Sequence, residues 1–211
     1  ETTKGSYVLT GRKDFVTMAA DAKWLLVAAK AGVSDEGRHQ IKLVKVDVSA
    51  DGVNVVALPP LPFIPDVSHG AVTFEDVIVN HNDIYSGDGY ADFVKPFRWH
   101  EDINVFISMA GYLLKLALTY QWPVGSKVEI ISILATLLSV QRMDADEPMA
   151  HIIMFDQSAK LECWLDRYDS AWNDVDPAVA VAWKRDRGIL KIANHARAAR
   201  YKKALSRTAL A

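Results

Sequence analysis

The chain has 211 residues and a formal net charge of −2, with 24 Lys and Arg against 26 Asp and Glu. Half of the residues are hydrophobic, which excludes a disordered chain. The balanced charge gives no electrostatic basis for general nucleic-acid binding. A single cysteine, Cys163, excludes an internal disulfide framework and an all-cysteine zinc site. This cysteine content fits a reducing cytoplasm, which is the expected location.

Targeting and membrane segments are not expected. The first five residues are polar, and no basic segment precedes an apolar one, so the sequence predicts no signal peptide. The longest apolar tract, 103–118, contains Asn104, Ser108 and Lys115, and we expect it to be too short and too polar to span a bilayer. There is no initiator Met and an apolar run begins within a few residues, so we expect the chain to begin inside a domain.

The first part of the chain, residues 1–95, is predicted to be a β-domain. Short runs rich in β-branched or aromatic residues are separated by Gly, Asp-Gly and Pro turn signals, with Gly11 dividing the first two runs. The candidate strands are residues 6–10, 14–18, 24–29, 40–46, 53–57 and 71–79. Strands of this length and spacing predict a small antiparallel β-barrel or β-sandwich.

Residues 96–211 have the apolar periodicity of helices. The first helix is indicated by apolar residues at three- and four-residue spacing between 103 and 117. Further helices are predicted at a Ser126–Glu129 capping box, at Pro148, and from Asp176-Pro177 through Tyr201. Helices joined by short loops predict an up-down four-helix bundle. The predicted fold class is therefore α+β, with a β-barrel or β-sandwich domain (1–95) followed by a four-helix bundle (96–211).

Several motifs follow one another in a recognisable order. Residues 11–19 read Gly-Arg-Lys-Asp-Phe-Val-Thr-Met-Ala, and Gly52-Val53 precedes the strand Val-Thr-Phe-Glu-Asp-Val-Ile-Val at 72–79. Gly87-Asp88-Gly89 then leads into a helix that carries Gly111 and, after it, Ala117-Leu118. In order and spacing this set resembles the acyl-CoA dehydrogenases over nearly the whole chain, from their middle β-domain into their C-terminal helical domain.

The resemblance implies a fold and an activity. Members have an N-terminal helical domain, which this sequence does not match, a middle β-domain and a C-terminal four-helix bundle. They bind FAD and an acyl-CoA substrate; a carboxylate removes the α-proton of the thioester and a hydride passes to FAD. They assemble as homodimers or homotetramers through the bundle. Candidate assembly surfaces here are the set Ile152, Ile153 and Phe155 or the run Trp164, Tyr168, Trp172.

Two cofactor contacts follow from the first motif. Phe15 matches the aromatic position that packs against the flavin ring, and Thr17 matches the hydroxyl position that hydrogen-bonds near flavin N5. From the residues alone, the pattern favours Phe15 as a core residue of a strand and Thr17 as an ordinary strand threonine. The contact role of both residues therefore depends on the resemblance.

The predicted catalytic base is not at the position that most members of the family use. Most members carry a late Glu-Gly, but residues 189–201 contain no carboxylate. A minority carry Glu in an E-R pair ten residues before a Gly of the first bundle helix, and Glu101 stands ten residues before Gly111. Here Asp102 replaces the Arg. A second carboxylate could disfavour ionisation of Glu101, or both could belong to a solvated first helical turn.

Other features leave alternatives open. Loss of the late Glu is compatible with a flavin-dependent monooxygenase of the same fold, which needs no thioester base. The usual Arg of an R-x-x-F-G motif is lost in 120–125, and this loss favours a non-catalytic homologue retained for assembly. The histidines lack the spacing of metal ligands, so no metal site is expected. The basic last helix is either a solvated face or a contact for an acidic subunit or phosphates. Cys163 is expected to be a buried structural thiol.

Overall fold

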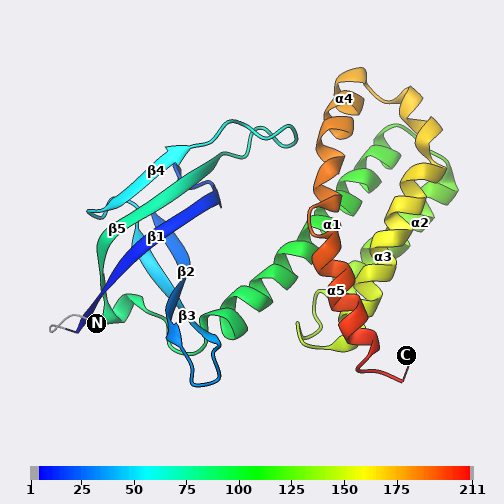
Figure 1. The fold of residues 1–211 in the computed structure, drawn as a ribbon. Coiled ribbons are helices and arrows are strands. Elements are labelled where there is room, and N and C mark those ends of the chain that lie inside the picture. Colours follow the sequence, from blue (N-terminus) through cyan, green and yellow to red (C-terminus); the bar gives the residue numbers. More distant parts are fainter. Residues whose placement is uncertain (1–4, 210–211) are drawn as a thin grey trace. The chain divides into compact units, whose positions relative to one another are not determined.

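The computed structural model describes residues 5–209, and the chain divides into two compact units between Phe97 and Arg98. Antiparallel strands build the first unit, the β unit, and helices build the second, the helical unit (Figure 1). This confirms the predicted α+β class with antiparallel sheets followed by a helical region.

The β unit has the sandwich form of the predicted fold. One sheet has the order β1 (Ser6–Thr17), β5 (His69–Asn80), β4 (Val53–Ala57), and a second sheet pairs β2 (Trp24–Val33) with β3 (His39–Asp47). Apolar side chains of both sheets share one core, which contains Ala19, Leu25, Val27, Val44, Val46, Val72, Phe74, Val77 and Val79. Burial of both inner faces in this common core is what holds the two sheets together.

The first strand differs from the prediction. Residues 6–10 and 14–18 were expected to form two strands with a turn at Gly11, but they are one strand, β1, and Gly11 pairs with Phe74 inside it. The 12-residue β5 offers a partner along the whole length of β1. Register shifts lie on either side of the central pairs, so the irregularity at Gly11 is absorbed by β-bulges rather than by a turn.

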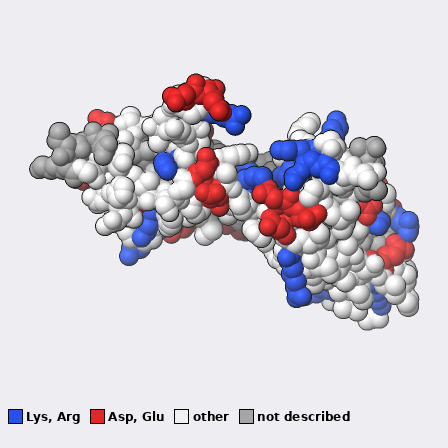
Figure 2. Space-filling model, turned by 90° about the horizontal axis from the view of Figure 1, so that it is seen from below, with Lys and Arg blue, Asp and Glu red and all other residues white. Residues whose placement is uncertain are grey.

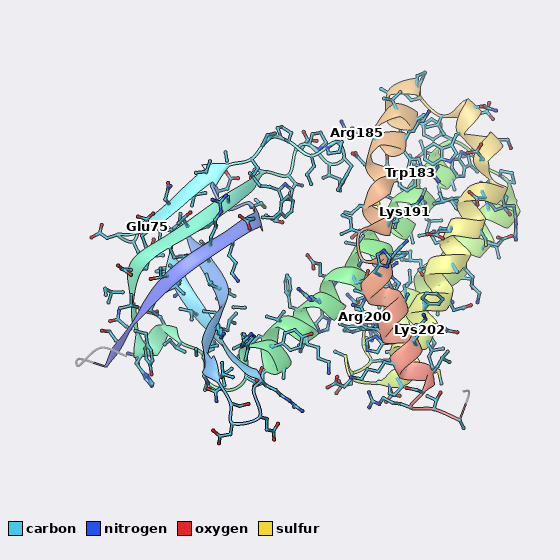
Figure 3. The ribbon with its side chains drawn as sticks, viewed as in Figure 1. Glu75, Trp183, Arg185, Lys191, Arg200 and Lys202 are labelled. Atoms are coloured by element: carbon cyan, nitrogen blue, oxygen red, sulfur yellow. The ribbon has the colours of Figure 1, made fainter. Side chains whose placement is uncertain are left out.

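The bulge in β5 explains the Phe-Glu-Asp-Val motif. Leu9 pairs with Val77 and Gly11 with Phe74, so one residue of β1 faces both Glu75 and Asp76. Asp76 has a positive φ of 51°, and Glu75 is labelled at this place in Figure 3. The extra residue shifts the alternation of side chains, and Phe74 and Val77 both reach the core although they are three positions apart.

Gly52 is the residue that makes room for this bulge. Glu75 N donates to Gly52 O at 2.8 Å. A Cβ atom on Gly52 would lie 2.1 Å from the carbonyl oxygen of Glu75, and Gly52 has φ +86°. Both the contact and the backbone conformation therefore require glycine.

We expect Gly52→Ala to lower the free energy of unfolding of the β unit by about 3 kcal/mol, because a strained backbone and a steric overlap each cost ~1–3 kcal/mol. Urea-dependent hydrogen exchange of peptides from β5 measures this. Gly32→Ala is the control within the same unit, since its Cβ would meet only the Gln40 side-chain oxygen, at 3.3 Å. Equal stability of the two variants would contradict the role of Gly52.

The loop before the first helix is tied to β3. A Cβ atom on Gly89 would lie 2.6 Å from the carbonyl carbon of Lys42, so glycine is needed where the loop crosses the strand. Asp88 caps the π-helical turn Gly89–Val94, and its carboxylate accepts from the N–H groups of Tyr90 and Ala91 at 2.8 Å.

The helical unit contains α1 (Lys95–Thr119), α2 (Val124–Val140), α3 (Pro148–Arg167), α4 (Pro177–Asp186) and α5 (Asn194–Leu205). Five of the seven predicted apolar positions of the first helix are buried, namely Ile103, Phe106, Ala110, Leu113 and Ala117. The other two, Ile107 and Leu114, are partly buried against the same core. The start signals at Pro148 and at Asp176 are also confirmed, and Asp176 Oδ1 accepts from Ala178 N at 2.8 Å.

The last predicted helix is broken. Residues 177–201 were expected to form one helix, but the 3₁₀ segment Arg187–Lys191 separates α4 from α5. Gly188 lies in this segment. Glycine is a poor helix former because it has the largest conformational freedom to lose, so the helix breaks there rather than elsewhere.

The predicted capping box is wrong. The Trp122-Pro123 turn already starts α2 at Val124, and the Ser126 hydroxyl donates to the Pro123 carbonyl at 2.8 Å instead of capping a helix. Glu129 accepts from Arg167 Nη1 at 2.8 Å. It therefore links α2 to α3 rather than completing a cap.

The prediction for Cys163 is also wrong, because the thiol is exposed. α3 buries Met154, Leu161 and Trp164 instead. Trp164 is 1% exposed, and its indole N–H donates to Ser126 O at 3.0 Å. The large indole fixes the rotation of α3, and this rotation turns Cys163 outward.

The aromatic run suggested as an assembly surface lies largely inside the unit. Trp122 stacks on Trp164 with ring centroids 5.7 Å apart and contacts Trp172 edge-on at 5.3 Å. Phe155, from the other suggested surface, stacks on Tyr201 at 4.2 Å. These rings therefore serve the packing of the helical unit itself.

One helical stretch of the described residues, Gly89–Thr119, is long and apolar enough to cross a membrane by length and composition alone. It is longer than the tract 103–118 that was expected to be too short and too polar. Ile103, Phe106 and Leu113 of this stretch are almost completely buried in the helical unit, and the core helix of a folded domain passes the same test.

Candidate functional site

The predicted site residues lie in two different units. Phe15 and Thr17 belong to the end of β1 in the β unit, and Glu101 belongs to α1 in the helical unit. Among residues 5–209, no group of three or more His, Cys, Asp or Glu side chains is arranged to hold a metal ion.

Phe15 is a surface residue of the β unit. Lys13 pairs with Val72 and Val16 with Gly70, so two residues of β1, one of them Phe15, face a single residue of β5. A β-bulge of this kind re-aims a side chain. Phe15 is 55% exposed and Val16 packs against the core instead. Phe15 is therefore not the core residue that the strand pattern alone allowed.

Phe15 stacks on His69, which stands two residues before the predicted strand 71–79. The two rings have centroids 4.3 Å apart and an interplanar angle of 25°. His69 is only 9% exposed and is the first residue of β5, where it pairs with Thr17. Thr17 is exposed. The exposed Phe15 ring, the Thr17 side chain and the largely buried imidazole thus gather at one end of the β1–β5 ladder.

Hydrogen bonds fix the backbone around this end of the ladder. Met18 N donates to Ser68 O at 2.7 Å, and Leu58 N donates to His69 O at 2.9 Å. The Ser68 hydroxyl donates to Asp21 Oδ2 at 2.6 Å. The segments before and after the two strands are therefore held to each other, and the Phe15–His69 pair stands on a defined backbone.

Glu101 and Asp102 have opposite surroundings, although they are consecutive. Glu101 is exposed, and within residues 5–209 no hydrogen bond or ion pair engages its carboxylate. Asp102 is 6% exposed. The two carboxylates therefore form neither the joint site nor the solvated helical turn that the sequence suggested.

Asp102 joins α1 to α5 through two arginines. Its Oδ1 accepts from Arg197 Nη2 at 2.7 Å, and its Oδ2 accepts from Arg200 Nη2. The Arg197 guanidinium also lies over the Phe106 ring, 4.4 Å from its centroid. Burial lowers the pKa of Arg200, and the neighbouring Asp102 opposes this shift. Arg200 is labelled on α5 in Figure 3. We call these three residues, Asp102, Arg197 and Arg200, the Asp102 cluster.

The Asp102 cluster was missed because the basic last helix was interpreted as solvated or as a contact surface. Arg197 is 4% exposed, which excludes a solvated face for this residue. A signal existed in the sequence: Asp102 stands three residues after Trp99 and four before Phe106, on the buried stripe of α1. A charged residue on such a stripe requires a buried partner.

A surface groove lies elsewhere on the helical unit, between α2 and α3. It has a volume of about 500 Å³ and is lined by residues that include Glu129, Lys160, Cys163 and Arg167. Phe15, Thr17 and Glu101 do not line it. On the face of the molecule in Figure 2, acidic and basic side chains lie interspersed rather than in a stripe of one sign.

Part of the chain matches a known protein family. Residues 1–77 match the family model described as "Acyl-CoA dehydrogenase, middle domain". No curated protein matches the chain by sequence.

Among solved structures, butyryl-CoA dehydrogenase from Megasphaera elsdenii is similar with a TM-score of 0.71 and 17% identity, covering 97% of this chain and 62% of that one. A probable acyl-CoA dehydrogenase from Mycobacterium abscessus is similar with a TM-score of 0.70 and 15% identity, covering 97% of this chain and 62% of that one. An FAD complex of PigA is similar with a TM-score of 0.69 and 15% identity, covering 97% of this chain and 62% of that one.

The resemblance found in the sequence is thereby confirmed. Residues 1–77 match the model of the acyl-CoA dehydrogenase middle domain, and the chain has a fold similar to that of the middle and C-terminal domains of acyl-CoA dehydrogenases. The chain spans 62% of the length of these solved relatives.

Proposed function

We propose that the protein is an FAD-dependent acyl-CoA dehydrogenase that oxidises the α,β-bond of an acyl-CoA thioester. The match of residues 1–77 to the family's middle domain supports this most directly. Within that domain Phe15 stands exposed at the position that the motif assigns to the flavin contact. A phenylalanine that is 55% exposed on a strand offers a flat apolar surface for a planar cofactor.

The residues at the end of the β1–β5 ladder fit such a cofactor. One face of the Phe15 ring is covered by His69 and the ring is otherwise exposed. In the proposed complex Phe15 packs against the flavin ring and the Thr17 hydroxyl hydrogen-bonds to its edge. When bound, FAD supplies the hydride acceptor that no side chain can provide.

Glu101 is the proposed base that takes the α-proton of the thioester. Its carboxylate is free of described protein partners and can therefore accept a proton. Its neighbour Asp102 is paired with two arginines and is unsuited to this role. Instead, the Asp102 cluster holds the first turns of α1 against α5, which orients the helix that carries Glu101.

A homo-oligomer in a reducing cytoplasm is part of the proposal. α2 buries Ile130, Ile133 and Leu137 on one side. On another side it exposes apolar residues at four-, three- and seven-residue spacing: Val124, Val128, Ile131 and Leu138 are between 42% and 73% exposed. A helix that is apolar on both sides supports contact with another subunit.

The visible absorption spectrum of the purified protein, before and after FAD is added, tests the proposal. We expect a retained flavin band whose position and shape differ from those of free FAD, because Phe15 and Thr17 alter the environment of the ring. Retained flavin without reduction by acyl-CoA, but with oxygen-dependent consumption of an external reduced flavin, would favour a monooxygenase. Absence of any flavin binding would favour a non-catalytic homologue.

A further inference from the structure

The imidazole beneath Phe15 has an unusual environment. His69 is 9% exposed, and its Nδ1 is enclosed without a hydrogen-bond partner among the described residues. A buried polar atom without a partner costs stability, which a phenyl or aliphatic side chain at this place would avoid. Stacking against Phe15 alone therefore does not account for an imidazole here.

The two ring nitrogens of His69 differ. A proton on the enclosed Nδ1 would have no acceptor, which favours the tautomer that carries the proton on Nε2. Within residues 5–209, Nε2 accepts and donates no hydrogen bond, and it is not among the atoms that are buried without a hydrogen-bond partner, so it is not enclosed as Nδ1 is. The geometry thus leaves the Nε2–H of His69 as a hydrogen-bond donor beside the exposed ring of Phe15. The centroids of the two rings are 4.3 Å apart.

We propose that His69 is a further flavin-contact residue: its ring positions Phe15 by stacking, and its Nε2–H donates a hydrogen bond to the polar edge of the bound flavin ring. This inference rests on the proposed function, because it takes FAD as the ligand. Nothing in the first motif of the chain pointed to it, since His69 follows Phe15 by 54 positions and reaches it only through the pairing of β1 with β5.

Two variants separate the two contributions of His69. His69→Phe keeps a flat ring beneath Phe15 but removes the donor, and we expect it to weaken FAD binding about fivefold, the loss of one neutral hydrogen bond. His69→Leu removes both the flat ring and the donor, and we expect a loss of about 30-fold. Fluorescence quenching of FAD on titration with protein measures both affinities.

A spectroscopic signal distinguishes direct contact from a structural role. In ¹⁵N-histidine-labelled protein, FAD is expected to shift the Nε2 resonance of His69. The visible bands of bound FAD should change in His69→Phe, although the Phe15 ring resonances stay near their wild-type positions. If His69 only stabilised the sheet, adding FAD would not shift its Nε2 resonance, and His69→Phe would not change the visible bands of bound FAD.

The matched control lies at the other end of the same ladder. His81 stacks on Tyr7 with centroids 6.4 Å apart and an interplanar angle of 25°, and we expect His81→Phe to bind FAD as the wild type does. Wild-type affinity and unchanged flavin bands in His69→Phe would overturn this inference and leave the proposed function intact. A wild-type protein that binds no FAD would overturn both.

Discussion

Replacing Glu101 with glutamine is expected to slow the reduction of bound FAD by acyl-CoA at least about 100-fold, the usual contribution of a general base. The amide has nearly the shape of the carboxylate but cannot take the α-proton. FAD affinity should stay near the wild-type value, because the proposed flavin contacts lie on β1 and β5 of the β unit and not on α1. Anaerobic stopped-flow bleaching of the flavin band after mixing with a series of acyl-CoA thioesters measures the rate.

Glu162 provides the matched control for this experiment. It is an exposed carboxylate on α3, another helix of the same unit, and Glu162→Gln should leave the rate unchanged. Wild-type reduction by Glu101→Gln would remove Glu101 from the role of base. If both variants and the wild type hold FAD but none is reduced by any acyl-CoA, the dehydrogenase function itself fails.

Replacing Asp102 with alanine is expected to lower the free energy of unfolding of the helical unit by about 3–5 kcal/mol, the cost of leaving a buried charge without its partner. The side chains of Asp102 and Arg197 are 4% and 5% exposed, so water cannot replace the lost carboxylate. Urea-dependent hydrogen exchange of peptides from α1 and α5 measures the change where the contact is lost.

The exposed pair Asp156–Lys160 is the control for the Asp102 cluster. Its side chains are 52% and 58% exposed, and we expect Asp156→Ala to change stability by less than about 1 kcal/mol, since water screens and replaces such a contact. If Asp102→Ala unfolded with the same urea dependence as Asp156→Ala, the Asp102 cluster would not hold α1 to α5.

Local patterns predicted most of the elements. The spacing of apolar residues located the buried face of α1, and Asp176-Pro177 located the start of α4. These signals are local, because side chains three or four positions apart share one face of a helix and a cap contacts its own first turn. Predictions were wrong where two local signals lie close together. Ser126 was predicted to cap a helix, but the Trp122-Pro123 turn starts that helix earlier and the Ser126 hydroxyl donates to the Pro123 carbonyl.

The candidate site was only partly predictable. The motif of residues 11–19 drew attention to Phe15 and Thr17, and the spacing to Gly111 drew attention to Glu101. Their roles remain predictions. The sequence could not show that Phe15 is exposed on a β-bulge or that His69 lies beneath it, because both facts depend on the register between strands distant in the chain.

The amino-acid sequence by itself determined the order of the parts: strands with turn signals come first and helices follow, and the motifs across the boundary resemble those of acyl-CoA dehydrogenases. Only the tertiary structure decided which side chains meet. Asp102 and Arg197 are 95 positions apart, and their pairing turns two charges that look solvated into a buried contact. The physical reason is that periodicity reports which face of an element is apolar, whereas the partner of each face is set by how whole elements pack.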